Sequence, residues 1–340
     1  MLSPSLVNFR RLARVAALFA AVVVVVGAWV RLTQAGLGCP DWPGCYGHVH
    51  PASVVDQAVQ AGAAYGRAFN YEKALHEMLH RYIASTLGVM IVVLAALSVW
   101  NRRNPDQPRV LPWIVLGLVL VQGALGAFTV TLLVIPLIVT LHLAGGLTTM
   151  ALLYWMSLAP EARQADDSDR SLRRFAAVIL GVTILQVLLG GWTSTNYAAP
   201  ACPDFPTCQG TVLPHADYSQ AFVLWRGLGV DYEGGVLSTP ARTAIHLTHR
   251  AGAIVVGASV LLLSFVAFRG GRTARVRLAA LAVGAAVLLQ WLIGMNLIWR
   301  GFPLWLGTAH NAGAVLLLLS ILTLLRTLWP HPGAGVDEPV

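Results

Sequence analysis

The stretch His76-Glu77-Met78-Leu79-His80-Arg81 and the later stretch His246-Leu247-Thr248-His249-Arg250 each place an imidazole directly before a guanidinium. Both lie just inside apolar runs that are long enough to cross a membrane as helices. An ionisable side chain at the centre of a bilayer costs about 2.5 to 3.5 kcal/mol on insertion scales, so its presence there indicates a function. The same costly pattern occurs twice in this chain.

The composition is that of a polytopic membrane protein. Of the 340 residues, 56% are hydrophobic and only 11% are charged, which excludes an ordinary soluble domain. The net charge of +8 does not indicate nucleic acid as a partner, because basic residues of membrane proteins gather in cytoplasmic loops. The placement of these charges therefore matters more than their sum.

Eight apolar runs have spanning length. The first could be a signal peptide, but it continues through Arg31-Leu32-Thr33 without a small-residue cleavage site, which favours an uncleaved helix. The sequence therefore predicts an all-α polytopic membrane protein with eight transmembrane helices. The runs cover about residues 15–30, 74–100, 110–132, 135–158, 174–193, 242–268, 276–298 and 304–328.

The distribution of Lys and Arg predicts the orientation. With the N-terminus inside the cell, fifteen of the 23 basic residues fall in cytoplasmic segments and eight do not. Two of those eight, Arg81 and Arg250, lie within predicted helices. The excess on one side predicts that both termini are cytoplasmic and that the long segments 34–72 and 195–240 lie outside.

The two halves of the chain resemble each other. Gly27–Pro51 aligns without gaps on Gly190–Pro214 with eleven identities in twenty-five positions, and later segments also match. Because each half has an even number of helices, both would share one orientation, as a parallel repeat with its axis along the membrane normal. We expect an N-terminal four-helix half at 1–160, a cytoplasmic linker at 161–173 and a C-terminal four-helix half at 174–340.

Four cysteines form two equally spaced pairs in the segments expected outside, Cys39 with Cys45 and Cys202 with Cys208. An oxidising compartment favours disulfides, and local pairs fit the repeat better than the other connectivities. Zinc is the alternative, but the spacing is loose and no nearby histidine repeats in both halves. A thiol-disulfide exchange role for the first pair stays open.

Four of the ten histidines lie within predicted helices at matched places in the repeat: His80, His142, His249 and His310. A single histidine there could be a satisfied core residue, but four matched ones indicate ligands, and haem is the natural candidate for iron bound by imidazole. Each lies roughly five to eight residues from the expected outer helix end, or about 10 Å deep. The remaining six, His48, His50, His76, His215, His246 and His331, fall in loops, at helix ends or in the tail.

The residues around the histidines differ between the halves. Arg81 and Arg250 can point outward toward haem propionates, or each can extend to the interface for purely structural reasons. Glu77 lies three residues before His80, whereas His246 takes that place before His249. A carboxylate in one half alone suggests that one haem site does chemistry and the other carries electrons.

Taken together, these residues resemble the haem A synthase family, in particular its bacterial, cysteine-containing members. The resemblance rests on Glu77-x-x-His80-Arg81, His249-Arg250, the histidines at 142 and 310, and both cysteine pairs. It implies that His249 and His310 bind a resident haem b, that His80 and His142 hold the substrate haem, and that Glu77 is the catalytic carboxylate. It also implies a location in the bacterial inner membrane, with the haem sites toward the outer face.

The activity implied by the resemblance is that of an oxidoreductase that oxidises the C8 methyl group of haem O to a formyl group, by successive hydroxylations and loss of water. Expected partners are haem O, haem O synthase, cytochrome oxidase assembly factors, membrane lipid and a second copy of the chain, with no nucleic acid. The alternative functions are a diheme b-type cytochrome that takes electrons from quinol, and a transporter. A cytochrome of that kind needs haems at two depths, and transporters tend to have helices broken near the midplane.

Overall fold

The computed structural model describes residues 4–158 and 167–329, and within those ranges it contains helices and no strand. Eight of the helices are long and apolar enough to cross a membrane, so the predicted all-α fold with eight spans is confirmed and the chain is a multi-pass membrane protein. They are α1 (Pro4–Leu32), α3 (Tyr71–Trp100), α4 (Leu111–Thr131), α5 (Pro136–Ser157), α6 (Asp167–Thr195), α8 (Thr239–Gly270), α9 (Ala274–Trp299) and α10 (Leu304–Thr327).

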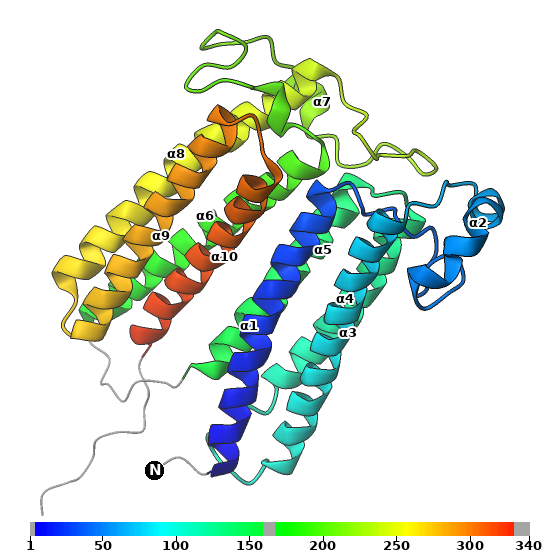
Figure 1. Cartoon of the computed structure of the whole chain (residues 1–340). Coiled ribbons are helices and arrows are strands. Elements are labelled where there is room, and N and C mark those ends of the chain that lie inside the picture. The colour runs from blue at the N-terminus through cyan, green and yellow to red at the C-terminus, as the bar shows by residue number, and fades with distance from the viewer. Residues whose placement is uncertain (1–3, 159–166, 330–340) are drawn as a thin grey trace, which may run out of the picture.

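The long helices form two groups of four that stand side by side (Figure 1). In the first group α1 and α4 each contact both α3 and α5, and in the second α8 packs against α6 and α9, with α10 against α6 and α9. The groups meet where α1 and α5 contact α10 and where α5 contacts α6. That they are parallel repeats stays a prediction. Of the expected linker, residues 161–166 lie outside the described residues, and 167–173 form the first turns of α6.

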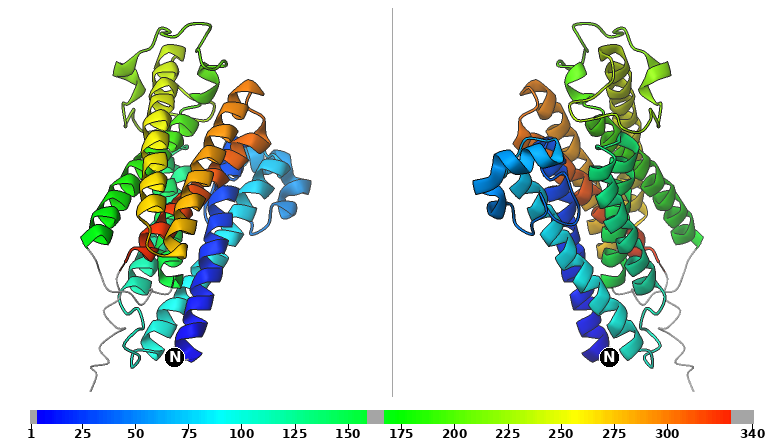
Figure 2. Two further views of the ribbon diagram at one scale, coloured as in Figure 1. Left: turned by 90° about the vertical axis from the view of Figure 1, so that its left-hand side faces the viewer. Right: turned by 90° about the vertical axis from the view of Figure 1, so that its right-hand side faces the viewer.

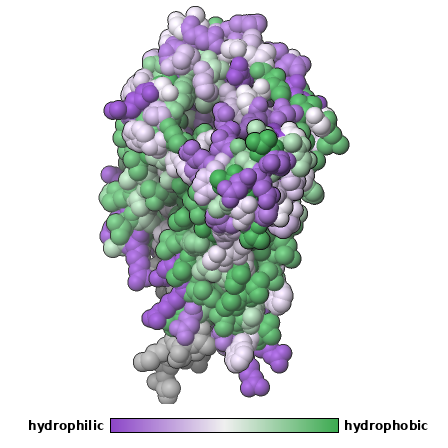
Figure 3. Space-filling model, turned by 45° about the vertical axis from the view of Figure 1, so that its right-hand side comes forward, coloured by the Kyte–Doolittle hydropathy of each residue, from purple (hydrophilic) through white to green (hydrophobic). Residues whose placement is uncertain are grey.

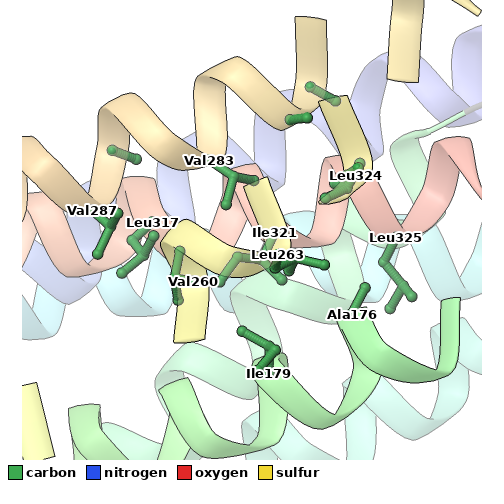
Figure 4. Close-up of a cluster of buried hydrophobic side chains, with 14 of the residues drawn as sticks. Ala176, Ile179, Val260, Leu263, Val283, Val287, Leu317, Ile321, Leu324 and Leu325 are labelled. Carbon is green, nitrogen blue, oxygen red and sulfur yellow. The ribbon is translucent and has the colours of Figure 1, made fainter. Parts of the chain in front are cut away.

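Two large apolar cores lie in the half of the bundle away from the long loops. One belongs to the second group, and the other belongs to the first group together with Val315 and Leu318 of α10. Figure 4 shows one of them, in which Val260, Leu263, Val283 and Ile321 converge from α8, α9 and α10. The side chains on the outside of the bundle are also apolar, and they form a broad hydrophobic surface below the polar loops in Figure 3. A helical bundle that is apolar on the inside and on the outside is what a lipid environment stabilises.

Two histidine-bearing helices begin earlier than their apolar runs. The Asn70 side chain accepts a hydrogen bond from the backbone N–H of Lys73 (3.0 Å), so α3 starts at Tyr71. Pro240 sits in the first turn of α8, where its missing N–H costs nothing, and α8 starts at Thr239. As a result, His80 and His249 lie nine and ten residues inside their helices, deeper than the sequence suggested.

The long segments after α1 and α6 lie at one end of the bundle, which we call the loop end (Figures 1 and 2). The first contains a 3-10 helix, η1 (Pro51–Gln57), and α2 (Ala58–Tyr65). The second contains η2 (Ala199–Ala201) and the single turn α7 (Tyr218–Ala221). Both cysteine pairs belong to this end, and they cover the histidine-bearing helices α3 and α8.

Candidate functional site

The four intrahelical histidines form two pairs, each inside one group of helices. His80 on α3 faces His142 on α5 with ring centroids 6.4 Å apart, and His249 on α8 faces His310 on α10 with centroids 6.5 Å apart. In each pair the two ring planes are close to perpendicular, at 83° and 77°. The matched histidines that the sequence singled out therefore meet within their own halves and not between them.

The spacing within each pair fits a haem iron held between two imidazoles. Two imidazoles that bind one metal from opposite sides, each with a nitrogen about 2 Å from it, place their ring centroids roughly 6 to 6.5 Å apart. The Nδ1 atoms of His80, His142 and His310 are buried without a hydrogen-bond partner among the described residues, as are those of His76 and His246 outside the pairs, although most buried polar atoms have a partner. The residues present therefore fit the group that the sequence predicts.

A glycine on the neighbouring helix makes room for each ring. A Cβ atom at Gly27 would lie 2.8 Å from Cε1 of His80, and one at Gly190 would lie 3.1 Å from Cε1 of His249. Gly126 and Gly294 stand in the same way against His142 (3.5 Å) and His310 (3.1 Å). The sequence comparison matched these glycines between the halves, but their contact with the rings could not be foreseen without the packing of the helices.

All four histidines lie toward the loop end of the bundle. His142 and His310 are each six residues after the first residue of their helix, and His80 and His249 are nine and ten residues after theirs. At 1.5 Å per residue these positions are about 9 to 15 Å from the helix starts. Two histidine pairs at a similar depth would not form a path for electrons across the membrane, which argues against the diheme cytochrome.

Arg81 and Arg250 both hold a cysteine loop against the helix that carries them. Arg81 donates hydrogen bonds to the backbone carbonyls of Pro43 (3.1 Å) and Gly44. Arg250 does the same with the carbonyls of Cys202 (3.0 Å), Asp204 (2.8 Å) and Thr207 (2.8 Å). The sequence placed these guanidinium groups toward haem propionates, and that role stays a prediction beside the contacts with the loops.

Glu77 is buried, with 5% of its surface exposed, and both of its oxygens are bonded. One accepts a hydrogen bond from the backbone N–H of Cys39 (2.9 Å), and the other forms an ion pair with Arg81. In the other half His246 is just as buried, and its Nε2 lies 3.3 Å from Nε of Arg250. Glu77 and His246 thus occupy the same place beside the arginine, and only the first half has a carboxylate there.

Both expected disulfides are present, Cys39–Cys45 and Cys202–Cys208. Within residues 4–158 and 167–329 no group of three or more histidine, cysteine or acidic side chains could hold a metal ion, so the zinc alternative has no support there. Asp41 organises the first loop by accepting from the backbone N–H of Tyr46 (2.6 Å) and Gly47 (2.8 Å).

Asp204 organises the second loop in the same way. It accepts from the backbone N–H groups of Gln209 (2.6 Å) and Gly210 (3.0 Å). The hydroxyl of Thr207, followed by these backbone groups, lowers the pKa of Asp204. The aspartates were visible in the sequence only as matched positions, and their role follows from the path of the loops.

The sequence analysis gave no role to three glutamines next to the histidines, Gln122, Gln186 and Gln290, although the repeat matches Gln122 with Gln290. Gln186 Nε2 lies 3.1 Å from Nδ1 of His249, and Gln290 Nε2 lies 3.4 Å from Nε2 of His310. Each of the three stands four residues before a glycine that faces a histidine ring. This repeated spacing was the signal in the sequence that could have found them.

Comparison with known proteins agrees with this site. The sequence model of the family described as cytochrome oxidase assembly protein, COX15-CtaA, matches residues 10–322. A heme A synthase of Shewanella oneidensis is 39% identical over 94% of this chain and 96% of its own length. Heme A synthases of Granulibacter bethesdensis (27% identical, 92% of this chain and 84% of the relative) and Rhodopseudomonas palustris (26% identical, 95% and 91%) are also similar.

Proposed function

Because the chain belongs to the COX15-CtaA family of cytochrome oxidase assembly proteins, we propose that it is an oxidoreductase that converts haem O to haem A for cytochrome oxidase. The observation that carries the proposal is the presence of two histidine pairs spaced for a haem, of which only one lies beside a buried carboxylate. A protein that turns over one haem with the help of another needs two sites of different chemistry.

The C-terminal pair, His249 and His310, holds the resident cofactor, haem b, and the N-terminal pair, His80 and His142, holds the substrate haem. Support comes from the asymmetry at one matched position, Glu77 in the first half and His246 in the second. Oxidation of the C8 methyl group to a formyl group releases protons, so it requires a group that can accept them, and a carboxylate can do so. When bound, haem b supplies one-electron redox chemistry.

The residues around Glu77 are suited to hold a proton acceptor in place. The Cys39 N–H and the Arg81 guanidinium fix both carboxylate oxygens, while the loop closed by Cys39–Cys45 keeps water away from this end of α3. Arg81 and Arg250 are also close enough to the loop end to meet haem propionates. The methyl-bearing edge of the substrate would then lie toward Glu77, which accepts protons as the methyl group is oxidised.

The cell location follows from charge and redox chemistry. The loop end carries both disulfides, which persist in an oxidising compartment, and most Lys and Arg residues belong to the opposite side. We therefore place the protein in the bacterial inner membrane, with both termini cytoplasmic and the haem sites toward the outer face. Haem O synthase, oxidase assembly factors and a second copy of the chain are the expected protein partners.

Pigment extraction from the purified protein tests the function. We expect haem b together with haem O or haem A; haem b alone would support the cytochrome instead, and colourless protein the transporter. His249→Ala and His310→Ala should remove the resident haem b spectrum because each would take away one of the two imidazoles that would hold the iron, while the exposed His215→Ala serves as the control. A full, unshifted b-type absorbance in both ligand variants would overturn the assignment of this half.

A further inference from the structure

Three of the four histidines share a second packing feature, a glutamine that lies over a glycine. Each of these histidines is followed after three residues by a glycine, namely Gly145, Gly252 and Gly313. A Cβ atom at these glycines would lie 1.7 Å from Nε2 of Gln122, 2.1 Å from Oε1 of Gln186 and 2.1 Å from Oε1 of Gln290. A side chain there would displace the amide, so the glycine is what lets the glutamine reach the histidine.

In the C-terminal half both glutamines bind their histidine. Gln186 donates to the backbone carbonyl of His249 (2.9 Å), and Gln290 donates to that of His310 (3.0 Å). The same amide nitrogens lie 3.1 and 3.4 Å from a ring nitrogen. Because an amide carries both a donor and an acceptor, it can satisfy that ring atom in either tautomer of the imidazole.

The N-terminal half is held less firmly. Gln122 Nε2 lies over Gly145 without a partner in the part of the chain that the structure describes. At Gln290, in contrast, the amide nitrogen donates to His310 and only Oε1 lacks a partner there. At His80 the glutamine is missing altogether. Val23 stands four residues before Gly27, and Ile83 takes the place of the glycine three residues after the histidine. Both belong to an apolar cluster, so packing alone holds His80.

We propose that Gln186 and Gln290 are positioning residues that fix His249 and His310 as permanent iron ligands, and that His80 is the displaceable ligand through which the substrate haem exchanges. This inference rests on the proposed function, in which the C-terminal haem stays through every turnover and the N-terminal haem enters and leaves. Outer partners of ligating histidines change metal affinity by about 10 to 100-fold, which is enough to separate a resident haem from an exchangeable one.

The first experiment removes the amides from the C-terminal half. Gln186→Met and Gln290→Met keep the length of the side chain and the contact with the glycine. Gln220→Met in α7 is the matched control, because the Gln220 side chain accepts a hydrogen bond from Arg226 in the outer segment and lies away from the histidine pairs. The purified full-length proteins are mixed with excess apomyoglobin, and the transfer of haem b is followed by absorbance. We expect haem b to leave about tenfold faster from both variants, with a shifted midpoint potential, and to leave the control at the wild-type rate. Wild-type transfer rates and potentials in both variants would overturn the role of the glutamines.

The second experiment builds the missing arrangement at His80 with the double change Val23→Gln and Ile83→Gly. Purified protein is loaded with a second equivalent of iron protoporphyrin IX, and its transfer to apomyoglobin is timed separately from that of the resident haem. We expect the second haem to leave about tenfold more slowly than from the wild type, with the resident haem unchanged. If the variant keeps its resident haem but releases the second at the wild-type rate, the role of His80 is wrong.

A third experiment makes the opposite change in the C-terminal half, so that the inference can still be tested if the Val23→Gln, Ile83→Gly variant does not fold. Gln186→Val with Gly252→Ile gives the C-terminal half the pattern found around His80, and it should make the resident haem exchange about tenfold faster; an unchanged rate counts against the inference. Conversion of haem O to haem A by the wild type is measured with the same purified protein. If the wild type makes haem A and no exchange rate responds, only this inference fails; if the wild type makes none, the proposed function fails whatever the rates.

Discussion

Both carboxylate oxygens of Glu77 are bonded, so two neighbouring residues, and not the helix alone, fix the position of this side chain. The Cys39 N–H binds one oxygen and the Arg81 guanidinium the other. Removing one partner of a buried ion pair is costly, because the other charge is left without compensation. Any test of Glu77 must therefore separate the loss of a proton acceptor from the loosening of the loop.

Glu77→Gln is the change that makes this separation. Glutamine keeps the volume and one acceptor oxygen but takes no proton, so the protein should fold, keep haem b, still bind haem O and make at least about 100-fold less haem A. Haem b content, bound haem O and haem A product are measured in the same preparation. Loss of haem or of protein in step with activity would show instead that Glu77 acts only by holding the loop.

His246→Gln is the reciprocal change in the other half. His246 stands at the same place beside Arg250, but we propose no proton transfer for it, so this variant should keep much more activity than Glu77→Gln. Normal haem A formation by Glu77→Gln would end the catalytic role of this residue, whatever the result at His246.

At the scale of helices, the apolar runs predicted the number of spans but not where the helices end. α1 begins at Pro4 and α6 at Asp167, well before their apolar runs. The sequence did not predict these starts, because hydropathy cannot distinguish the polar first turns of a helix from a loop. The contacts of Arg81 and Arg250 with the loop carbonyls escaped prediction for a related reason. They depend on how Asp41 and Asp204 turn each loop back onto its helix, and residue spacing does not reveal that path. The repeat indicated which histidines correspond between the halves, whereas the pairing within each half was predicted from the family resemblance.

The contact between helices α1 and α3 predicts a strong effect of a single methyl group. In Gly27→Ala the new Cβ atom would lie 2.8 Å from Cε1 of His80, which forces the ring or the helix to move at a cost of about 1 to 3 kcal/mol. We expect weaker haem O binding and an altered spectrum of the substrate haem, measured by titration of the purified protein, with normal resident haem b.

Gly88→Ala on α3 is the matched control, because a Cβ atom there meets nothing within 4 Å. It should bind haem O as the wild type does, or gain slightly in stability, since alanine favours a helix over glycine. Equal haem O binding by both alanine variants would contradict the close packing of Gly27 against His80.

At the scale of the whole molecule, the two groups of helices are joined by specific contacts near both ends. Arg31 on α1 donates to the backbone carbonyl of Ser194 (2.7 Å) and lies 4.1 Å from the ring centroid of Tyr197. Farther from the loop end, the hydroxyls of Tyr154 and Thr323 are 2.7 Å apart. These contacts link the group that carries His80 and His142 to the group that carries His249 and His310.

The outer segments add a third junction between the halves, a charge cluster made by Arg67, Lys73, Asp231 and Glu233. Arg67 lies 2.7 Å from Asp231 and 2.8 Å from Glu233, and Lys73 lies 3.4 Å from Glu233. These pairs are half-buried to exposed, and an ion pair near the surface contributes only about 0.2 to 1 kcal/mol. The cluster therefore cannot hold the fold together, but it can hold one loop against the other half.

Removing the acidic side of this cluster should free the loop without unfolding the protein. In Asp231→Asn with Glu233→Gln, we expect the amides of residues 226–236 to exchange hydrogen up to about tenfold faster, because the lost pairs together contribute roughly 1 kcal/mol or slightly more and about 1.4 kcal/mol is tenfold. The haem b content should stay unchanged. About 1 M salt should have a similar effect on the wild type, because it screens exposed charges to about 3 Å. Asp56→Asn, in the first outer segment, removes one negative charge away from the cluster and should leave exchange in 226–236 as it is. If the double variant exchanges at the wild-type rate at low salt, other contacts hold the loop, of which the bond from the Tyr232 N–H to the Leu133 carbonyl (3.2 Å) is the first to test.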